Sequence, residues 1–240
     1  MAVVCPAGSV VPGMTQPFRI ETAPGESVSA LLYPAAARAG ITLMLAHGAG
    51  AGQRSPFLVR FATGLAARGI DAVTFNFSYT EHGRRVPDPN AKLEACYRAA
   101  IATVRHSEKL GRGKLAIGGK SMGGRIASQV ASDGAEDVAG LVFLGYPLHP
   151  PAKPDQLRTK HLTDIAAPML FVQGSRDAFG TPGELRPVLA KLKAPAEIHV
   201  VEGGDHSFKV PKGAGIAQEA VHEAILDRIA GWLREKLLGR

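Results

Sequence analysis

A serine set between glycines is the clearest sign of chemistry in this chain of 240 residues. Residues 119–123 read GKSMG, which has the pattern G-x-S-x-G around Ser121. An apolar run at 115–117 precedes the motif, and apolar residues at helical spacing follow it. This context predicts a nucleophile elbow, a tight strand-to-helix turn that projects the serine oxygen from the backbone. The glycines fit, because a strained turn needs neighbours without bulky side chains.

A phosphate-binding loop is the main rival interpretation of the same residues. Residues 119–121 read GKS, the end of the pattern G-x-x-x-x-G-K-S. That pattern requires another glycine five residues before Gly119, where the chain has Lys114. An ordinary Gly/Ser turn is the other rival, and it would not require catalytic partners further along the chain.

Such partners are present. A serine hydroxyl is a weak nucleophile at neutral pH and needs a base within hydrogen-bond reach. His206, at the exit of the last predicted strand, is the expected base. Asp177, at the exit of the strand predicted at 168–172, is the expected acid that orients the imidazole. Asp205 is the alternative acid, but neighbouring side chains in a loop diverge, so it is badly placed to bond the imidazole of His206.

The developing negative charge on the substrate oxygen should be bound by two backbone N–H groups. One is that of Met122, the residue after the nucleophile. The other is expected from Ala49, with Gly50 as second choice, in the glycine-rich loop 47–52. His47 is expected to order this loop by hydrogen bonding rather than to perform chemistry.

Further residues are expected near the substrate: Gly48, Gly50, Tyr79, Arg125 and Tyr146. Arg125 lies one helical turn after the serine and therefore on the same helix face. The sequence leaves two roles open for it, binding of a substrate carboxylate or phosphate and pairing with a structural acid. Lys120 and Arg176 flank catalytic positions and could add positive potential or be ordinary surface charges.

Elements that alternate along the chain must position these residues. Apolar runs predict strands at 18–21, 28–33, 41–46, 72–77, 115–117, 140–144, 168–172 and 197–201. Helical spacing predicts helices at 56–68, 93–106, 122–131, 185–192 and 216–238. The order predicts an α/β fold with a doubly wound, mostly parallel sheet, whose first two strands form an antiparallel edge pair. His47, Ser121, Asp177 and His206 each follow a predicted strand, at the sheet edge where such folds bind ligands.

We expect residues 1–240 to form a single domain, with 1–16 as a loose N-terminal segment and no large cap domain. Residues 78–90 are predicted to be a polar loop. The segment 146–163, rich in proline, histidine and lysine, is either a small lid or a rigid connector.

Composition narrows the possible partners. The formal charge is +7, but the basic residues are scattered and no nucleic-acid motif is present. No apolar run approaches the roughly 18 residues of a membrane span, and the N-terminus lacks the pattern of a signal peptide. Cys5 and Cys96 form neither a disulfide framework nor a metal motif. We therefore expect a cytoplasmic protein with a small-molecule substrate, no metal, no cofactor, and no nucleic-acid or membrane partner. A homodimer remains open.

Six motifs along the chain resemble one superfamily: HGAGAG, FNFSY, GGKSMGGR, GYPLHPP, VQGSRDAFG and GGDHSF. The chain is similar to α/β-hydrolases of the small, dienelactone-hydrolase-like branch, from about Phe18 onward. It also resembles a narrower family of bacterial predicted hydrolases, shared with the hydrolase-like domain of a chromatin NSL-complex subunit. The chain order serine, aspartate, histidine is the order of that superfamily. Dienelactone hydrolases proper use a cysteine nucleophile where this chain has Ser121, which argues against a dienelactone substrate.

The resulting expectation is a serine hydrolase that cleaves a small ester or thioester through a Ser121-His206-Asp177 triad and an acyl-enzyme. The same triad could also cleave a peptide or C–C bond, which the sequence does not separate from ester cleavage. The alternative from another class is a weakly active or inactive binding or interaction module on the same fold.

Overall fold

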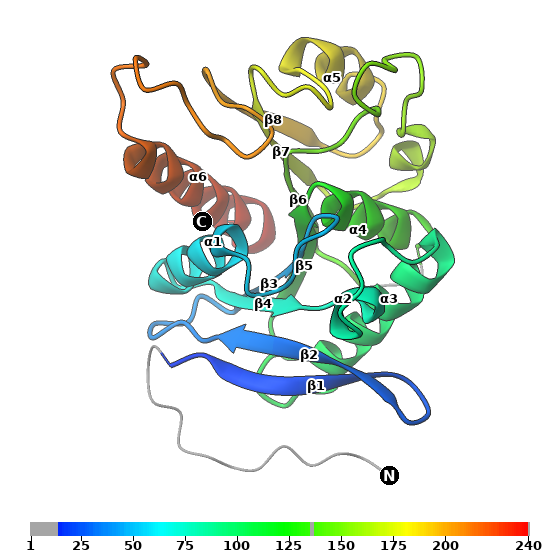
Figure 1. The fold of residues 1–240 in the computed structure, drawn as a ribbon. Helices are drawn as coiled ribbons and strands as arrows, with labels where there is room; N and C mark the ends of the chain where they lie inside the picture. Colours follow the sequence, from blue (N-terminus) through cyan, green and yellow to red (C-terminus); the bar gives the residue numbers. More distant parts are fainter. Residues whose placement is uncertain (1–13, 135–136, 240) are drawn as a thin grey trace.

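One sheet of eight strands forms the centre of the molecule, in the order β1-β2-β4-β3-β5-β6-β7-β8 (Figure 1). The structure is a computed structural model that describes residues 14–134 and 137–239. The strands are β1 (Gln16–Ala23), β2 (Glu26–Tyr33), β3 (Ile41–Ala46), β4 (Asp71–Phe75), β5 (Lys114–Lys120), β6 (Gly140–Leu144), β7 (Met169–Gly174) and β8 (Ala196–Val201). β2 pairs antiparallel with β1 and β4, and the other neighbours are parallel. The predicted mostly parallel sheet with an antiparallel edge is confirmed.

Helices cover both faces of this sheet (Figure 1). They are α1 (Pro56–Ala67), α2 (Ser78–Glu81), α3 (Asn90–His106), α4 (Met122–Ser132), the 3₁₀ turn η1 (Lys160–Asp164), α5 (Pro182–Leu189) and α6 (Gln218–Leu238). α1 and α6 bury Phe61 and Trp232 in one hydrophobic cluster, with Leu43 and Val142 of the sheet. α3 and α4 bury their apolar residues in the cluster on the other face. No large cap domain appears among the described residues.

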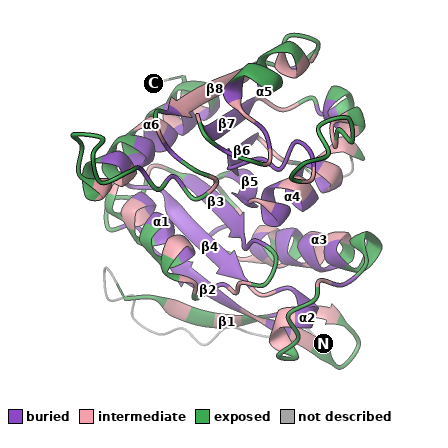
Figure 2. Cartoon of the chain, turned by 45° about the horizontal axis from the view of Figure 1, so that its top comes forward, coloured by how far each residue is buried: buried purple, intermediate pink, exposed green. Residues whose placement is uncertain are grey.

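The central strands are mostly apolar because both of their faces are covered. Every residue of β3, β4, β6 and β7 is buried, and Figure 2 shows these strands in purple. β1 instead alternates between exposed and less exposed positions, as an edge strand does. This difference explains why continuous apolar runs located the centre of the sheet from the sequence.

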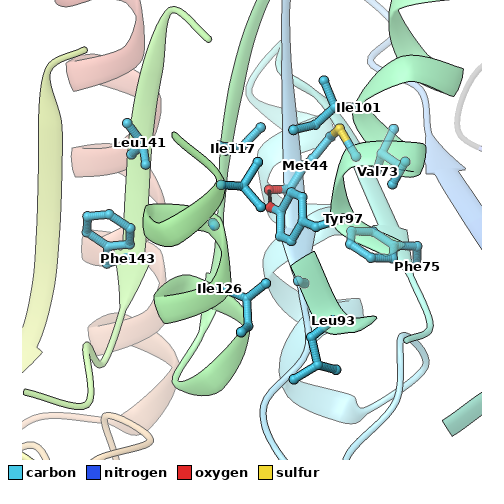
Figure 3. Close-up of a cluster of buried hydrophobic side chains, with 14 of the residues drawn as sticks. Met44, Val73, Phe75, Leu93, Tyr97, Ile101, Ile117, Ile126, Leu141 and Phe143 are labelled. Carbon is cyan, nitrogen blue, oxygen red and sulfur yellow. Dashed lines mark hydrogen bonds between the residues drawn. The ribbon is translucent and has the colours of Figure 1, made fainter. Parts of the chain in front are cut away.

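A buried tyrosine supports the strand that leads to the elbow. The Tyr97 hydroxyl of α3 donates to the Gly118 carbonyl (2.7 Å) and accepts from the Gly118 N–H (3.1 Å). A Cβ atom at Gly118 would lie 1.8 Å from the Val142 carbonyl oxygen, so this position admits only glycine. Figure 3 shows Tyr97 among the apolar side chains between the sheet and α3 and α4. The end of β5 is therefore held by the Tyr97 hydroxyl and packed closely against the backbone of β6 at Val142.

The structure differs from the predicted elements mainly at their ends. The helix predicted at 185–192 is α5 at Pro182–Leu189, because Thr181 caps it in a capping box with Glu184. β4 ends at Phe75, two residues early, because the Phe77 N–H donates to His47 Nε2 (3.1 Å) instead of continuing the strand. The short helix α2 lies in the segment predicted as a loop. Gln16 already belongs to β1, while residues 1–13 of the expected loose N-terminal segment lie outside the described residues. Among the described helices, none combines the length and apolar character needed to cross a bilayer.

Candidate active site

Ser121 lies at the turn between β5 and α4, in a backbone conformation that side chains rarely adopt. Its φ is 51° and its ψ is −116°. Its N–H donates to the Leu144 carbonyl of β6 (3.1 Å), and its carbonyl accepts from the N–H of Arg125 (3.1 Å). These two bonds hold the strained turn between the sheet and the first turn of α4.

The glycines of the motif are required by close packing against the end of β3. A Cβ atom at Gly119 would lie 2.4 Å from the Ala46 carbonyl oxygen, and one at Gly123 would lie 2.3 Å from the same atom. Gly119 also has a φ of +155°. Neither position can therefore accept a side chain without moving the backbone.

Three predicted residues from separate loops meet in one hydrogen-bonded relay. His206 Nε2 lies 2.8 Å from Ser121 Oγ, and His206 Nδ1 lies 2.8 Å from Asp177 Oδ2. Ser121 follows β5, Asp177 follows β7 and His206 follows β8. With a neutral imidazole, Nδ1–H donates to the carboxylate and Nε2 accepts the serine proton, which is the arrangement that a triad needs.

Asp177 is held in place by bonds from its own loop. Its side chain is buried, and it accepts hydrogen bonds from Gln173 Nε2 (2.7 Å, Oδ2) and from the Phe179 N–H (2.8 Å, Oδ1). Asp205, the alternative acid, instead accepts from the N–H groups of Ser207 (2.8 Å) and Lys209 (2.9 Å). Asp205 therefore orders the histidine loop and takes no part in the relay.

Lys120 helps to fix the position of His206 through its backbone carbonyl. Its ammonium donates to the His206 carbonyl oxygen at 2.6 Å and lies 5.7 Å from the centroid of the Phe57 ring. Burial lowers the pKa of Lys120 to about 8, against the opposing effect of Asp177 and Asp205. The Phe179 ring packs on the imidazole with a centroid distance of 4.3 Å.

His47 orders the glycine-rich loop, as its sequence position predicts. The side chain is fully buried, and burial lowers its pKa to about 4, so the ring is neutral at pH 7. Because Nε2 accepts from the Phe77 N–H (3.1 Å), the proton must be on Nδ1, which donates to the Gly48 carbonyl (2.9 Å). The Ala51 N–H donates to the same carbonyl (3.2 Å).

The held Gly48 carbonyl sets the direction of the next N–H group. In a trans peptide the N–H of Ala49 points opposite to that carbonyl, hence away from His47. A Cβ atom at Gly48 would lie 3.6 Å from Ser121 Cβ, so this loop lies against the serine. Within the described part of the chain, the N–H groups of Ala49 and Met122 have no acceptor. Both are therefore available to a substrate oxygen.

The relay opens onto a cavity of about 570 Å³. Its walls come from the loop after β3, the start of α1, the segment before and within α3, the elbow, the segment after β6, and the loops that carry Asp177 and His206. The lining residues are Gly48, Ala49, Ala51, Ser55, Phe57, Leu58, Pro87, Asp88, Asn90, Leu93, Lys120, Ser121, Met122, Arg125, Pro147, Arg158, Phe179, His206 and Ser207.

Three of the residues expected near the substrate do not line this cavity. Gly50 is exposed within the glycine-rich loop, while Tyr79 and Tyr146 are fully buried. Tyr79 packs 5.8 Å from the His47 ring, and Tyr146 O–H donates to the Arg158 carbonyl (2.8 Å). Each tyrosine follows its strand as expected, but the chain then turns the ring into the core, so it supports a wall instead of forming its surface.

Gln173 and Arg158 belong to the site, and the sequence did not single them out. Gln173 is the one polar side chain of the otherwise apolar strand β7, and this exception could have marked it as a functional residue from the sequence. Its amide bonds Asp177, the Tyr146 N–H (2.9 Å) and the Gly180 carbonyl (2.7 Å). Arg158 had no sequence signal, because its place depends on how the segment after β6 folds back. In the described residues, no group of three or more His, Cys, Asp or Glu side chains could hold a metal ion.

A serine elbow, an acid after β7 and a histidine after β8, around a mostly parallel sheet, define the class of α/β-hydrolases. The family model described as alpha/beta hydrolase domain matches residues 39–234, and the chain belongs to this family.

Solved structures with the same fold are similar over nearly the whole chain. A dienelactone hydrolase from Anabaena variabilis has a TM-score of 0.74 and 19% identity, covering 95% of this chain and 100% of its own. An alpha-beta serine hydrolase homologue from Coxiella burnetii has a TM-score of 0.73 and 19% identity, covering 94% and 100%. The esterase domain of a Rhodothermus marinus protein has a TM-score of 0.69 and 14% identity, covering 93% and 99%. At these identities the likeness concerns the fold.

Proposed function

We propose that this α/β-hydrolase cleaves a small ester or thioester through Ser121, His206, Asp177 and a covalent acyl-enzyme. One observation carries the proposal: the unbroken relay, with 2.8 Å at each of its two hydrogen bonds, ends at the wall of the cavity. The similar structures described as dienelactone hydrolase, serine hydrolase and esterase support the reaction class.

Acylation follows from this geometry. Ser121 Oγ attacks the carbonyl carbon as its proton passes to His206 Nε2, and the buried carboxylate of Asp177 stabilises the imidazolium. The substrate oxygen takes the negative charge, next to the N–H groups of Ala49 and Met122. Each such donor contributes about 3–4 kcal/mol to the transition state. The bond to the leaving oxygen or sulfur then breaks, and that atom takes the proton from His206.

Deacylation repeats these steps with water. Water gives a proton to His206 Nε2 while its oxygen attacks the acyl carbon, and the bond to Ser121 Oγ breaks as the proton returns to that oxygen. The products are a carboxylic acid and an alcohol or thiol. The chemistry is complete with the side chains present and uses no redox step.

An inactive interaction module, as the resemblance to a chromatin-complex subunit implies, is the second candidate. A scaffold has no physical need for a strained serine bonded to a buried histidine–aspartate pair. We therefore favour the enzyme. One domain over residues 1–240, a cytoplasmic location and a homodimer stay predictions.

Labelling with a fluorophosphonate probe tests the proposal. Wild-type protein is expected to be labelled and to hydrolyse 4-nitrophenyl hexanoate, and Ser121→Ala to lose both. Ser132→Ala, at the far end of the same helix α4, is the matched control and should behave as wild type. A well-folded wild-type protein that is neither labelled nor active on esters would rule the hydrolase out.

Asp177→Asn tests the relay itself. The asparagine cannot hold the imidazole in the tautomer that accepts the serine proton, so kcat should fall by about 10⁴-fold. KM should change far less, since Asp177 does not line the cavity. A kcat within tenfold of wild type would exclude Asp177 as the orienting acid.

A further inference from the structure

The catalytic cavity carries more positive than negative charge. Its basic lining side chains are Lys120, Arg125 and Arg158, and Asp88 is its acidic one. Asp88 is already paired, because its Oδ1 accepts from Arg84 Nη2 at 2.6 Å. The excess positive charge therefore has no counterpart among the residues that line the cavity.

The hydrogen bonds of the Arg125 side chain go to neutral groups. Its Nη1 donates to Gln129 Oε1 and its Nη2 to Asn90 Oδ1, both at 3.1 Å. It forms no ion pair with any described carboxylate, whereas Arg68 on the protein surface pairs with both Glu223 (2.7 Å) and Asp227 (2.7 Å). Of the two roles that the sequence left open for Arg125, the structure removes pairing with a structural acid.

Arg158 brings a second guanidinium to the same wall. Its backbone is fixed, since its N–H donates to the Leu148 carbonyl (2.8 Å) and its carbonyl accepts from the buried Tyr146 hydroxyl (2.8 Å). Its side chain likewise has no carboxylate partner among the described residues, and it is only partly exposed. The buried Tyr146 hydroxyl therefore helps to fix the backbone at Arg158.

The two guanidinium groups repel each other across the cavity that both of them line. Burial lowers the pKa of Arg125 and the charge of Arg158 lowers it further, against the smaller opposing effects of Tyr146 and Glu94. Like charges in a partly desolvated site destabilise the free protein unless an anion lies between them. A carboxylate or phosphate offers the acceptor geometry that a guanidinium binds through two parallel hydrogen bonds.

The position of the pair indicates which part of a substrate it contacts. The leaving group must depart beside His206 Nε2, which protonates it. Asn90, the partner of Arg125, begins α3, and α3 packs against α4 and β1, on the side of Ser121 away from β8. Arg125 is four residues after the serine, a rise of about 6 Å along α4. An acyl chain of a few carbon atoms spans that distance.

We propose that the preferred substrates are esters or thioesters whose acyl part ends in a second, anionic group, a carboxylate or a phosphate, bound by Arg125 and Arg158. This inference rests on the proposed hydrolase function and names the substrate class of the same site.

Two esters of equal chain length test it. The mono-4-nitrophenyl ester of adipic acid and 4-nitrophenyl hexanoate differ only in the terminal carboxylate. The wild-type protein should favour the adipate ester in kcat/KM. Arg125→Gln and Arg158→Gln should each lower the ratio of the two kcat/KM values by about tenfold or more, as expected for loss of a charged hydrogen bond. Arg125→Lys, which keeps the charge but not the fork, should fall between.

Arg186→Gln is the matched control for overall charge. Arg186 is exposed on α5 and does not line the cavity, so its loss should leave the preference as in wild type. If this variant lowers the ratio as far as Arg125→Gln does, the preference comes from the net charge of the protein and the binding pair is excluded.

Inhibition separates the two sources of the anion. Adipate and inorganic phosphate are each added during hydrolysis of 4-nitrophenyl hexanoate, and the tighter competitive inhibitor names the anion. The inhibition constant should rise about tenfold in Arg158→Gln. Equal kcat/KM for both esters, with no inhibition by either anion, would overturn the anion site and leave the hydrolase intact.

A different result is expected if the proposed hydrolase function, and not the anion site, is wrong. Ser121 would then resist the fluorophosphonate, and neither ester would be cleaved. The anion site is still tested in that case by calorimetric titration of wild-type protein with adipate and with phosphate. Binding that is lost in Arg125→Gln supports the site, and no binding of either anion overturns it.

Discussion

Ser121 carries both the reactive oxygen and a strained backbone. A φ of 51° with a ψ of −116° is costly for any residue with a Cβ atom, by about 1–3 kcal/mol. The strain is maintained by the Leu144 and Arg125 backbone bonds and by the glycines packed on Ala46. The structure therefore gives up stability in order to direct the hydroxyl at His206.

This strain can be measured by comparing two inactive variants. Both Ser121→Gly and Ser121→Ala remove the bond to His206, but only glycine relaxes at a positive φ. After allowing for the greater freedom of glycine in the unfolded chain, Ser121→Gly should be more stable than Ser121→Ala by about 1 kcal/mol. Urea denaturation gives both free energies of unfolding. A glycine variant less stable than the alanine variant would show that the turn stores no strain.

For single residues, the sequence predicts a catalytic role where a local motif or a strand end marks the position. Ser121 was predicted from its glycines, and the positions of Asp177 and His206 from the ends of their strands. Tyr79 and Tyr146 have the same kind of position, yet both rings turn into the core. The direction of a side chain after a strand depends on packing, which no local pattern contains.

At the scale of the elements, the buried Lys120 ammonium connects a strand of the sheet to the loop that carries His206 and should affect catalysis. It joins the last residue of β5 to the loop after β8 through the His206 carbonyl (2.6 Å). Its pKa of about 8 means that the ammonium loses its proton as the pH rises through that value. The neutral amine is a weaker donor, and the positive charge at the cavity is lost with the proton.

Lys120→Met tests this connection. Losing a charged hydrogen bond that positions the base should lower kcat by about tenfold. Wild-type activity on 4-nitrophenyl hexanoate should also fall above about pH 8, and this fall should be absent in Lys120→Met. Lys114→Met, at the exposed start of the same strand, is the control. An unchanged alkaline limb in Lys120→Met would show that Lys120 supports the structure only.

The elements themselves were more predictable than their ends. The continuous apolar runs of β3 and β7 located two central strands, since both faces of each are buried. The end of β4 was wrong by two residues because Phe77 bonds His47, a residue 30 positions earlier. Boundaries that depend on such distant partners leave no local pattern in the sequence.

Across the whole molecule, two histidines link the site to the stability of the fold: His47, which is fully buried, and His161, which is half-buried. His47 holds the glycine-rich loop on one side of the cavity. His161 Nε2 lies 2.7 Å from Ser128 Oγ of α4, the helix that carries Arg125. Burial lowers the pKa of each histidine to about 4, and the charge of Arg125 adds to the effect on His161. Protonation of His47 would also direct Nε2–H at the Phe77 N–H, which would lose its acceptor.

The protein should therefore lose stability in mild acid. Each histidine has its ordinary pKa of 6.5 in the unfolded chain and about 4 in the folded protein. Between these values the unfolded chain binds protons that the folded protein does not, so the free energy of unfolding falls as the pH falls. The contribution of His47 is fully present above pH 6.5 and lost by about pH 4, and its upper limit is about 3 kcal/mol.

Urea denaturation of wild type and His47→Gln at pH 7 and pH 4.5 measures this contribution. The stability lost between the two pH values should be smaller in His47→Gln by about 1–3 kcal/mol. If that variant does not fold, His161→Gln should show a smaller loss in the same direction. His106→Gln, at an exposed histidine at the end of α3, is the control and should lose as much stability as wild type. The neutral imidazole of His47 holds the Gly48 carbonyl, so its protonation should destabilise the fold. If both His47→Gln and His161→Gln lose as much stability between pH 7 and pH 4.5 as wild type, neither histidine contributes to the loss of stability in acid.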